Sequence, residues 1–336
     1  MMKKVAVIIL NWNGAALLRK YLPSVIENTD AEVADVIVAD NGSTDDSLQV
    51  LASEFPGVRT ILFEQNHGFA GGYNLALQQC SEYEYSVLLN SDVRTPARWL
   101  QPLLAYMKQN PQVGAVQPKI LKDRDDDRQV FEYAGAAGGF IDRHGYPFCR
   151  GRIFGTVEDD YGQYDTDEPL DIFWATGACL MVRTELYNRL GGLDAGFFAH
   201  MEEIDLCWRI HLAGFAIKAV TQSRVYHLGG GSLPQGNPRK VYLNFRNNLI
   251  LLHKNLPQKQ GRRLLFVRRL YDSLAFFAEV AKLHFASARA IIKAHNDFRQ
   301  MRKQYTTFPS RDARKDIPAC NCDIIADYYL RHRRTF

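Results

Sequence analysis

Four largely apolar runs alternate with helix-like segments in the first hundred residues, and each run ends in a polar or glycine-rich stretch. The runs cover residues 5–10, 36–39, 58–63 and 85–89. Buried strands that alternate with helices are typical of a parallel sheet covered by helices on both faces. Because the carboxyl ends of parallel strands meet at one edge, the four polar stretches should line a binding cleft there.

The first two stretches supply candidate contacts for a nucleotide. Asn11 and Asn13 follow the first run, and Asp40 and Asn41 follow the second. An acidic residue at a strand end can accept hydrogen bonds from a base or ribose. Capping of the following helix explains Asp40 equally well, since Asp and Asn are good caps.

The third stretch, residues 66–74, contains Asn66, Gly71, Gly72 and Asn74. Its glycines would let the backbone approach a ligand closely and present N–H groups to a phosphate or base. It matches neither the G-x-G-x-x-G fingerprint nor a P-loop with G-K-[ST]. A dehydrogenase and an ATPase are therefore disfavoured.

The fourth run ends in Asn90, Ser91 and Asp92. A carboxylate at this edge suits Mg²⁺ or Mn²⁺ holding a diphosphate, because these ions take few protein carboxylates together with phosphates and waters. A helix cap is the alternative for Asp92. His227, which precedes a glycine-rich stretch at 228–232, could add an imidazole ligand or serve only a structural purpose.

A second acidic cluster begins the helix predicted over residues 202–213. Glu202, Glu203 and Asp205 lie in its first turn. Acidic residues there complement the helix dipole, which is one explanation of the cluster. The other is that one carboxylate faces the cleft as a general base.

The charge of the chain is unevenly distributed. Residues 239–336 carry 21 Lys and Arg against 7 Asp and Glu, a net +14, whereas residues 1–238 carry 20 against 30, a net −10. Arginine pairs alternate with bulky apolar residues over 262–277, which suits a helix lying on an anionic membrane surface. A helical subdomain with a solvated basic face is an equal alternative. The region has no RNA-binding or zinc-finger signature, so no nucleic-acid partner is expected.

Targeting and redox signals are few. No apolar stretch reaches the ~20 residues that span a bilayer. The six cysteines have no metal-ligand spacing, and reduced thiols in a cytosolic protein are predicted. We therefore expect a cytoplasmic protein that can attach peripherally to the inner face of the plasma membrane.

The motifs, taken in order, resemble those of the family 2 glycosyltransferases with a GT-A fold. The resemblance is closest to the bacterial, rhamnosyltransferase-like branch that builds cell-surface polysaccharides. It rests on residues 7–14, 40–45, 66–74, 88–92, 174–178 and 202–209. Each motif is weak alone, but six in the same order are specific.

The resemblance implies a fold and a domain organisation. The expected fold class is α/β, with a Rossmann-like, mixed and mostly parallel sheet between helices and a C-terminal helical region. A GT-A domain would span residues 1–237, its donor half about 1–118 and its acceptor half about 119–237. Residues 238–336 would form the basic helical region. Within the acceptor half, residues 122–170 predict irregular loops and short antiparallel strands.

The resemblance also implies an activity: inverting transfer of a sugar from a nucleotide-diphosphate sugar to a glycan or lipid-linked acceptor. Asp92 and His227 would hold Mg²⁺ or Mn²⁺, although Asn90 replaces the first Asp of the family's D-x-D motif. The base maps to Glu203, with Glu202 as the second candidate, since the family usually has Glu-Asp there. Residues implied at the donor site are Asn11, Asn13, Asp40, Asn41, Asn66, Gly71, Gly72, Asn74, Asn90 and Ser91, and those at the acceptor site are Trp174 and Asp205.

Two other functions remain open at this point. A catalytically inert nucleotide-sugar binder would keep Asp40 and Asp92 but would not need Glu203. A nucleotidyltransferase would carry a basic, glycine-rich signature near the N-terminus, and residues 11–14 have no positive charge. The inert binder is the stronger alternative.

Overall fold

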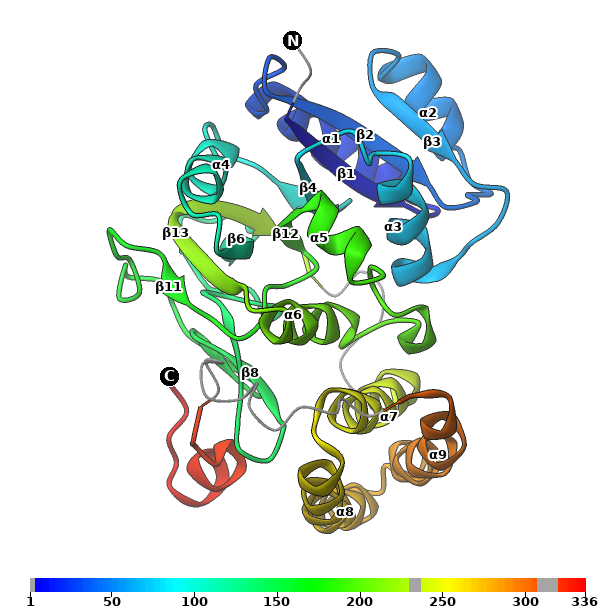
Figure 1. Ribbon diagram of the computed structural model, residues 1–336, viewed down its shortest axis with the longest axis vertical. Coiled ribbons are helices and arrows are strands. Elements are labelled where there is room, and N and C mark those ends of the chain that lie inside the picture. The colour runs from blue at the N-terminus through cyan, green and yellow to red at the C-terminus, as the bar shows by residue number, and fades with distance from the viewer. Residues whose placement is uncertain (1–3, 230–236, 307–319) are drawn as a thin grey trace.

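The computed structural model of the chain describes residues 4–229, 237–306 and 320–336. A large mixed sheet forms the centre of the molecule, and the C-terminal helices pack below it in the view of Figure 1. The strand order of the sheet is β11-β13-β6-β12-β4-β1-β2-β3, with β5 paired to β13. Its strands are β1 (Val5–Asn11), β2 (Ala34–Asp40), β3 (Arg59–Leu62), β4 (Tyr85–Asn90), β5 (Val93–Arg94), β6 (Val113–Lys122), β11 (Leu170–Asp171), β12 (Cys179–Arg183) and β13 (Ala216–His227).

The first four strands are parallel, as predicted. β1 lies between β2 and β4, and its residue Asn11 is in register with Asp40 of β2. On the other side, Leu10 is in register with Asn90 of β4. β3 continues the parallel order beyond β2. The polar residues that follow these strands therefore emerge at one edge, which is where the alternating sequence pattern placed the cleft.

Helices cover both faces of the sheet. Alternate residues of β1 belong to two separate buried clusters, Val7 to one and Ile8 to the other. The Val7 cluster includes α1 (Ala15–Asn28), α2 (Ser47–Glu54) and α4 (Leu100–Gln109), and the Ile8 cluster includes α3 (Gly68–Gln78), α5 (Thr184–Arg189) and α6 (Glu202–Leu212). This two-sided burial explains why the strands read as continuous apolar runs.

The expected insertion is confirmed as a small antiparallel sheet. It consists of β7 (Gly139–Ile141), β8 (Pro147–Cys149), β9 (Arg152–Ile153) and β10 (Thr156–Val157). The predicted fold class is confirmed as well, because the main sheet is mixed and mostly parallel where the cleft forms, with helices on both faces.

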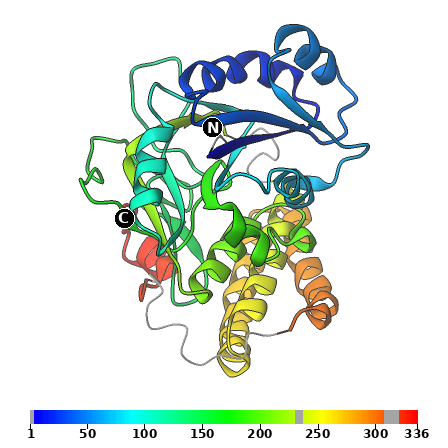
Figure 2. The same ribbon diagram turned by 45° about the horizontal axis from the view of Figure 1, so that its top comes forward.

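Three long helices follow: α7 (Pro238–Asn255), α8 (Gln258–Ala281) and α9 (Phe285–Met301). In Figures 1 and 2 they lie together beside α6. Residues 249–252 of α7 are buried in the same cluster as Ile204 and Leu206 of α6. The hydrophobic core thus crosses the expected boundary at residue 237, and α7 helps to build the region around α6.

An ion pair is buried between these helices. Arg268 and Asp272 of α8 are 3.2 Å apart and nearly inaccessible to solvent. Asp272 also lies 3.0 Å from His295 of α9, and the Arg268 guanidinium stacks 3.7 Å from the ring centre of Tyr146. These contacts determine which face of α8 points into the protein.

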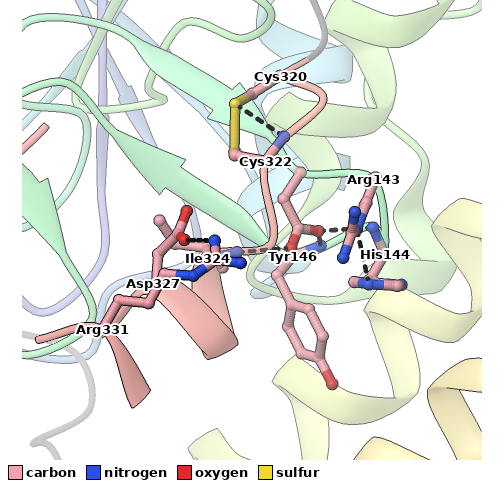
Figure 3. The surroundings of a disulfide bond; sticks show 9 residues. Arg143, His144, Tyr146, Cys320, Cys322, Ile324, Asp327 and Arg331 are labelled. Carbon is pink, nitrogen blue, oxygen red and sulfur yellow. Dashed lines mark hydrogen bonds and ion pairs between the residues drawn. A yellow bond between two sulfur atoms is a disulfide. The ribbon is translucent and has the colours of Figure 1, made fainter. Parts of the chain in front are cut away.

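The C-terminal segment folds back on the small sheet (Figure 3). Cys320 donates a main-chain hydrogen bond to Ile141, and Ile324 donates one to the carboxylate of Asp142. Cys320 and Cys322 form a disulfide, so the prediction of reduced thiols is wrong for this pair. Their closeness in one short segment bound to β7 brings the sulfur atoms together. Cys80, Cys149, Cys179 and Cys207 are free and buried.

Short turns of other helix types complete the fold. They are the 3₁₀ helices Ala195–Phe197 and Arg302–Gln304 and the π-helix Ala326–Leu330. Among the described residues, every helix is too short or too polar to span a bilayer.

Candidate active site

The ends of β1 and β2 are joined by a hydrogen-bonded group of side chains. Asn11 donates to Asp40 through atoms 2.9 Å apart, and the Ser43 hydroxyl donates to the same Asp40 oxygen at 2.7 Å. Asn11 and Asp40 are almost completely buried. Both side chains therefore shape the loop at 41–44 from beneath. With this burial they would affect a bound nucleotide indirectly, through the residues that they position.

The next layer outward consists of asparagines. Asn13 accepts a hydrogen bond from the Thr44 main chain at 2.7 Å, and Asn41 donates to Asn66 at 3.0 Å. Asn41 also accepts one from the His67 main chain, which links the second and third loops. Asn13 and Asn66 are exposed at the edge.

The glycine-rich stretch is a helix rather than an open loop. α3 begins at Gly68, and a Cβ on Gly72 would approach Leu10 of β1 to 2.7 Å, so this glycine serves helix–sheet packing. Asn74 uses its amide to donate to the Leu193 carbonyl at 2.7 Å and accepts from the Leu193 N–H at 2.9 Å. Gly72 and Asn74 are thus engaged in internal packing, and the donor-binding roles expected of them stay predictions. Gly71, half-buried one residue earlier, lies in the first turn.

The end of β4 meets the end of β13. Asp92 Oδ1 lies 3.0 Å from His227 Nε2, and the Asn90 amide lies 3.3 Å from the same nitrogen. Glu132, which sequence reasoning missed, lies 3.3 Å from the other ring nitrogen, Nδ1. Burial would lower the pKa of His227, but Asp92 and Glu132 outweigh it and raise the pKa to about 10. The imidazole therefore lies between two acidic side chains that favour its protonated form.

Few side chains of this cluster could act as metal ligands. Within residues 4–229, 237–306 and 320–336, no group of three or more His, Cys, Asp or Glu is arranged to hold a metal ion. Asp92 and His227 nevertheless present one carboxylate oxygen and one imidazole nitrogen close together. Ser91 is half-buried beside them. The glycine-rich stretch after His227 lies largely outside the described residues.

The carboxylate pair expected to contain the base begins α6. Glu202 is buried and Glu203 is half-buried. Burial raises the pKa of Glu203 to about 7, and burial together with the neighbouring Glu203 raises that of Glu202 well above its usual value. One carboxyl oxygen of each has no hydrogen-bond partner among the described residues. A carboxylate with a pKa near neutrality and an unpaired oxygen has the properties of a general base.

The end of β4 and the carboxylate pair at the start of α6 lie on either side of residues 176–178. The Ala178 carbonyl accepts a hydrogen bond from the Asn90 main chain at 3.0 Å. A Cβ built on the adjacent Gly177 would lie 4.0 Å from Glu203 and 3.1 Å from Phe69 of α3. The strand end with Asp92 and the helix start with Glu203 therefore flank the same short turn.

The loop before α6 adopts an unusual backbone. Phe198, His200 and Met201 have φ angles of 66°, 69° and 76°, a region that costs free energy for residues other than glycine. Burial lowers the pKa of His200 to about 4, so its imidazole is neutral. Such strain persists only where surrounding contacts impose it.

Those contacts come from α7. Asn247 donates to the carbonyls of Phe197, Ala199 and His200 at 3.0, 2.8 and 2.7 Å. Arg246 donates to the carbonyl of Phe197 at 2.8 Å. We call Arg246 and Asn247 the α7 clamp. Sequence reasoning missed it; the only local signal is adjacent polar residues at 246–248 inside an apolar helix.

The two expected acceptor residues do not reach the cleft. Trp174 is only 4% exposed, and its indole N–H donates to the Phe140 carbonyl, so neither ring face is available as a sugar platform. Asp205 is inaccessible and pairs with Arg209 and Lys254, each at 2.8 Å. Packing of β7 and α7 covers both side chains, and the acceptor role expected of them stays a prediction.

A comparison with protein families agrees with this geometry. The model described as Glycosyl transferase family 2 matches residues 6–187, more than half of the chain. The match includes Asp40 and Asp92 and ends before α6.

Two curated relatives carry related activities in their names. An N-acetylglucosaminyl-diphospho-decaprenol L-rhamnosyltransferase of Mycobacterium tuberculosis (strain CDC 1551 / Oshkosh) is 28% identical over 66% of this chain and 75% of its own length. The rhamnosyltransferase WbbL of Escherichia coli (strain K12) is 24% identical over 66% of this chain and 83% of its own length.

Solved structures share the fold. GalNAc-T7, solved with UDP, GalNAc and Mn²⁺, matches with a TM-score of 0.59 at 18% identity, over 75% of this chain and 48% of that one. The mannosyltransferase PcManGT of Pyrobaculum calidifontis, solved with GDP-Man and Mn²⁺, matches with a TM-score of 0.52 at 17% identity, over 89% and 87%. These likenesses confirm the predicted GT-A fold.

Proposed function

The chain belongs to glycosyl transferase family 2, and we propose on that basis that it transfers a sugar from a nucleotide-diphosphate sugar to a hydroxyl of a glycan or lipid-linked acceptor. Transfer proceeds with inversion at the anomeric carbon. The observation that carries the proposal is the turn at 176–178, which places the start of α6 with Glu203 beside the end of β4 with Asp92.

Glu203 is the proposed base. It accepts the proton of the acceptor hydroxyl as that oxygen attacks the anomeric carbon opposite the departing diphosphate. A pKa of about 7 leaves a substantial fraction of Glu203 ionised at neutral pH and still makes it basic enough to accept a proton. Glu202, more deeply buried and with a pKa further above normal, is better suited to remain protonated.

Asp92 and His227 fit a divalent metal ion. A carboxylate oxygen and an imidazole nitrogen 3.0 Å apart form a partial ligand set of the kind that Mg²⁺ or Mn²⁺ completes with phosphate oxygens and water. Glu132 lies on the other side of the ring, where carboxylates commonly orient a metal-binding histidine. When bound, such an ion neutralises the diphosphate leaving group. Asn13, Asn66, Asn90 and Ser91 remain the proposed contacts for the donor.

The acceptor and the donor sugar are proposed from the relatives. The names of two of them specify rhamnosyl transfer, and one specifies a decaprenol-linked diphosphate acceptor. We therefore favour a deoxyhexosyl or hexosyl donor and an acceptor linked to a lipid, used at the cytoplasmic side of a membrane in polysaccharide synthesis.

The experiment that tests the function measures binding and hydrolysis of a panel of nucleotide sugars with Mn²⁺ or Mg²⁺. Asp92→Ala should lose metal-dependent binding of the donor, and Glu203→Gln should keep binding but lose turnover. Glu202→Gln tests the assignment of the base, and Asn296→Ala, an exposed position of α9, is the control.

Two results would contradict the proposal. Donor binding without turnover, for every acceptor tried and in the wild type, would support the inert nucleotide-sugar binder. Absence of any nucleotide-sugar binding would overturn both alternatives.

A further inference from the structure

Helix α8 buries two charged residues and carries a row of exposed apolar residues on another side. The residues it buries are Gly261, Arg268 and Asp272. Its large apolar side chains at 266, 270, 274 and 277 point outward instead, with exposed fractions of 62, 57, 67 and 64%. Spacings of four, four and three residues place these four side chains on one face of the helix, which we call the α8 outer face. An exposed apolar row of this size commonly marks an interaction surface.

The buried ion pair prevents α8 from turning this face inward. Rotation of the helix would carry Arg268 and Asp272 together out of the interior, and it would break the 3.0 Å contact of Asp272 with His295 of α9. Asp272 would then lose its partner on α9, and the Arg268 guanidinium would lose its contact with the Tyr146 ring. The outward position of the apolar row is therefore a fixed property of the fold.

The charges around the α8 outer face are positive. Lys259, Arg262, Arg263 and Arg269 are exposed on this helix. Its two acidic residues are Asp272, which is buried, and Glu279, which contacts Lys282 and His284 at its C-terminal end. An apolar row flanked by cations is the pattern of a helix that lies in the interface of an anionic bilayer.

The turn between α8 and α9 extends the same surface. Leu283 and Phe285 are 72% and 54% exposed, beside the exposed Lys282. Apolar side chains at a helical turn can enter the headgroup region while the neighbouring cations contact phosphates.

We propose that the α8 outer face and the adjoining turn dock on an anionic phospholipid bilayer. The inference rests on the proposed function only in that a lipid-linked acceptor is presented at such a surface. A second copy of this chain fits less well, because a twofold contact would oppose the same cations on both protomers. The attachment is peripheral, since it uses an exposed surface of the folded helix.

Sedimentation with vesicles tests the proposal. The full chain should bind vesicles of phosphatidylcholine and phosphatidylglycerol at low salt and bind pure phosphatidylcholine much more weakly. Phe266→Ser combined with Leu270→Ser should reduce binding by at least ~10-fold, and Arg262→Glu combined with Arg269→Glu should abolish the preference for anionic lipid. Leu48→Ser, on the exposed side of α2 at the opposite end of the molecule in Figure 1, should bind like wild type.

Several results would overturn the docking proposal. One is wild-type protein that remains in solution with anionic vesicles at low salt. Another is a serine double variant that binds vesicles as wild type does. A third is a wild-type dimer in light scattering that the serine variant converts to monomer, with neither form binding vesicles, which would make the face a protein interface.

Binding of a soluble nucleotide sugar separates this proposal from the proposed function. The serine double variant should bind the donor as wild type does, which also shows that it is folded. Wild type that binds vesicles but no nucleotide sugar would refute the enzymatic function and leave the docking surface intact.

Discussion

The side-chain amide of Asn247 donates a 2.7 Å hydrogen bond to the main-chain carbonyl of His200, three residues before Glu203. Asn247 belongs to α7, beyond the boundary that the sequence suggested for the catalytic domain. The contact means that the C-terminal helices hold the proposed base in position. A strained loop and the clamp that imposes the strain lie together at the candidate site.

The α7 clamp should matter for catalysis as well as for stability. Asn247→Ala removes the side-chain donor of the Ala199 and His200 carbonyls, while the Phe197 carbonyl keeps Arg246, so we expect a loss of about 2–4 kcal/mol in the free energy of unfolding. Because the loop before Glu203 would move, kcat should fall about 10- to 100-fold. Denaturant unfolding and steady-state kinetics measure the two effects.

Asn248→Ala is the matched control for the clamp. Asn248 is equally buried in α7 but donates to the Gly145 carbonyl, away from the loop. It should lower stability with little change in kcat. Equal losses of kcat in the two variants would contradict a specific positioning role for Asn247.

The activity should depend on the ionisation of the carboxylate pair. Because Glu203 must be deprotonated to act as a base and its pKa is raised to about 7, kcat/KM should rise with pH and level off above neutrality. A profile measured with a soluble acceptor from about pH 5 to about pH 9 would show this inflection, which belongs to the coupled pair. A flat profile with the chemical step rate-limiting would argue against Glu203 as the base.

The same raised pKa should cost stability at high pH. In the unfolded chain a glutamate loses its proton near pH 4.3, whereas Glu203 in the fold keeps its proton until about pH 7. The folded state binds more protons in this interval, so stability falls as pH rises through it. Glu203→Gln should therefore raise the free energy of unfolding at about pH 8 by up to about 3 kcal/mol, and by less at about pH 5. Equal stabilisation at both pH values would contradict this.

Breaking the buried pair of α8 should destabilise the chain strongly. Arg268→Leu leaves Asp272 buried without its guanidinium partner, and we expect a loss of about 3–5 kcal/mol in denaturant unfolding. The double change Arg268→Leu with Asp272→Leu should cost less than the single one. Lys293→Ala removes the exposed pair with Asp297 and should cost less than about 1 kcal/mol.

Gly139 lies so close to Trp174 that no side chain should fit at position 139. A Cβ on Gly139 would lie 2.0 Å from the buried indole, so Gly139→Ala should destabilise by about 1–3 kcal/mol or more through overpacking. Gly155→Ala, between β9 and β10 of the same small sheet, meets nothing within 4 Å and should be nearly neutral. A neutral Gly139→Ala would mean that Trp174 can move, and would reopen its role at the acceptor site.

The local motifs of the sequence determined the parallel half of the sheet and the residues at its carboxyl edge. The sequence alone was enough to select Asp92 as a candidate metal ligand and Glu203 as a candidate base. This is because apolar runs and the first turn of a helix are encoded by neighbouring residues. The order of strands then placed Asn11, Asp40 and Asn90 at one edge, since register follows from strand period and direction.

Only the tertiary structure decided which polar residues face the cleft and which are internal. Asn74, Trp174 and Asp205 are built into the core by partners distant in sequence, namely Leu193, Phe140 and Lys254. Glu132 and Asn247 enter the candidate site for the same reason, and apart from the run of polar residues at 246–248 no local pattern marks them. A side chain's role depends on which surfaces pack against it, and that packing is a property of the folded whole.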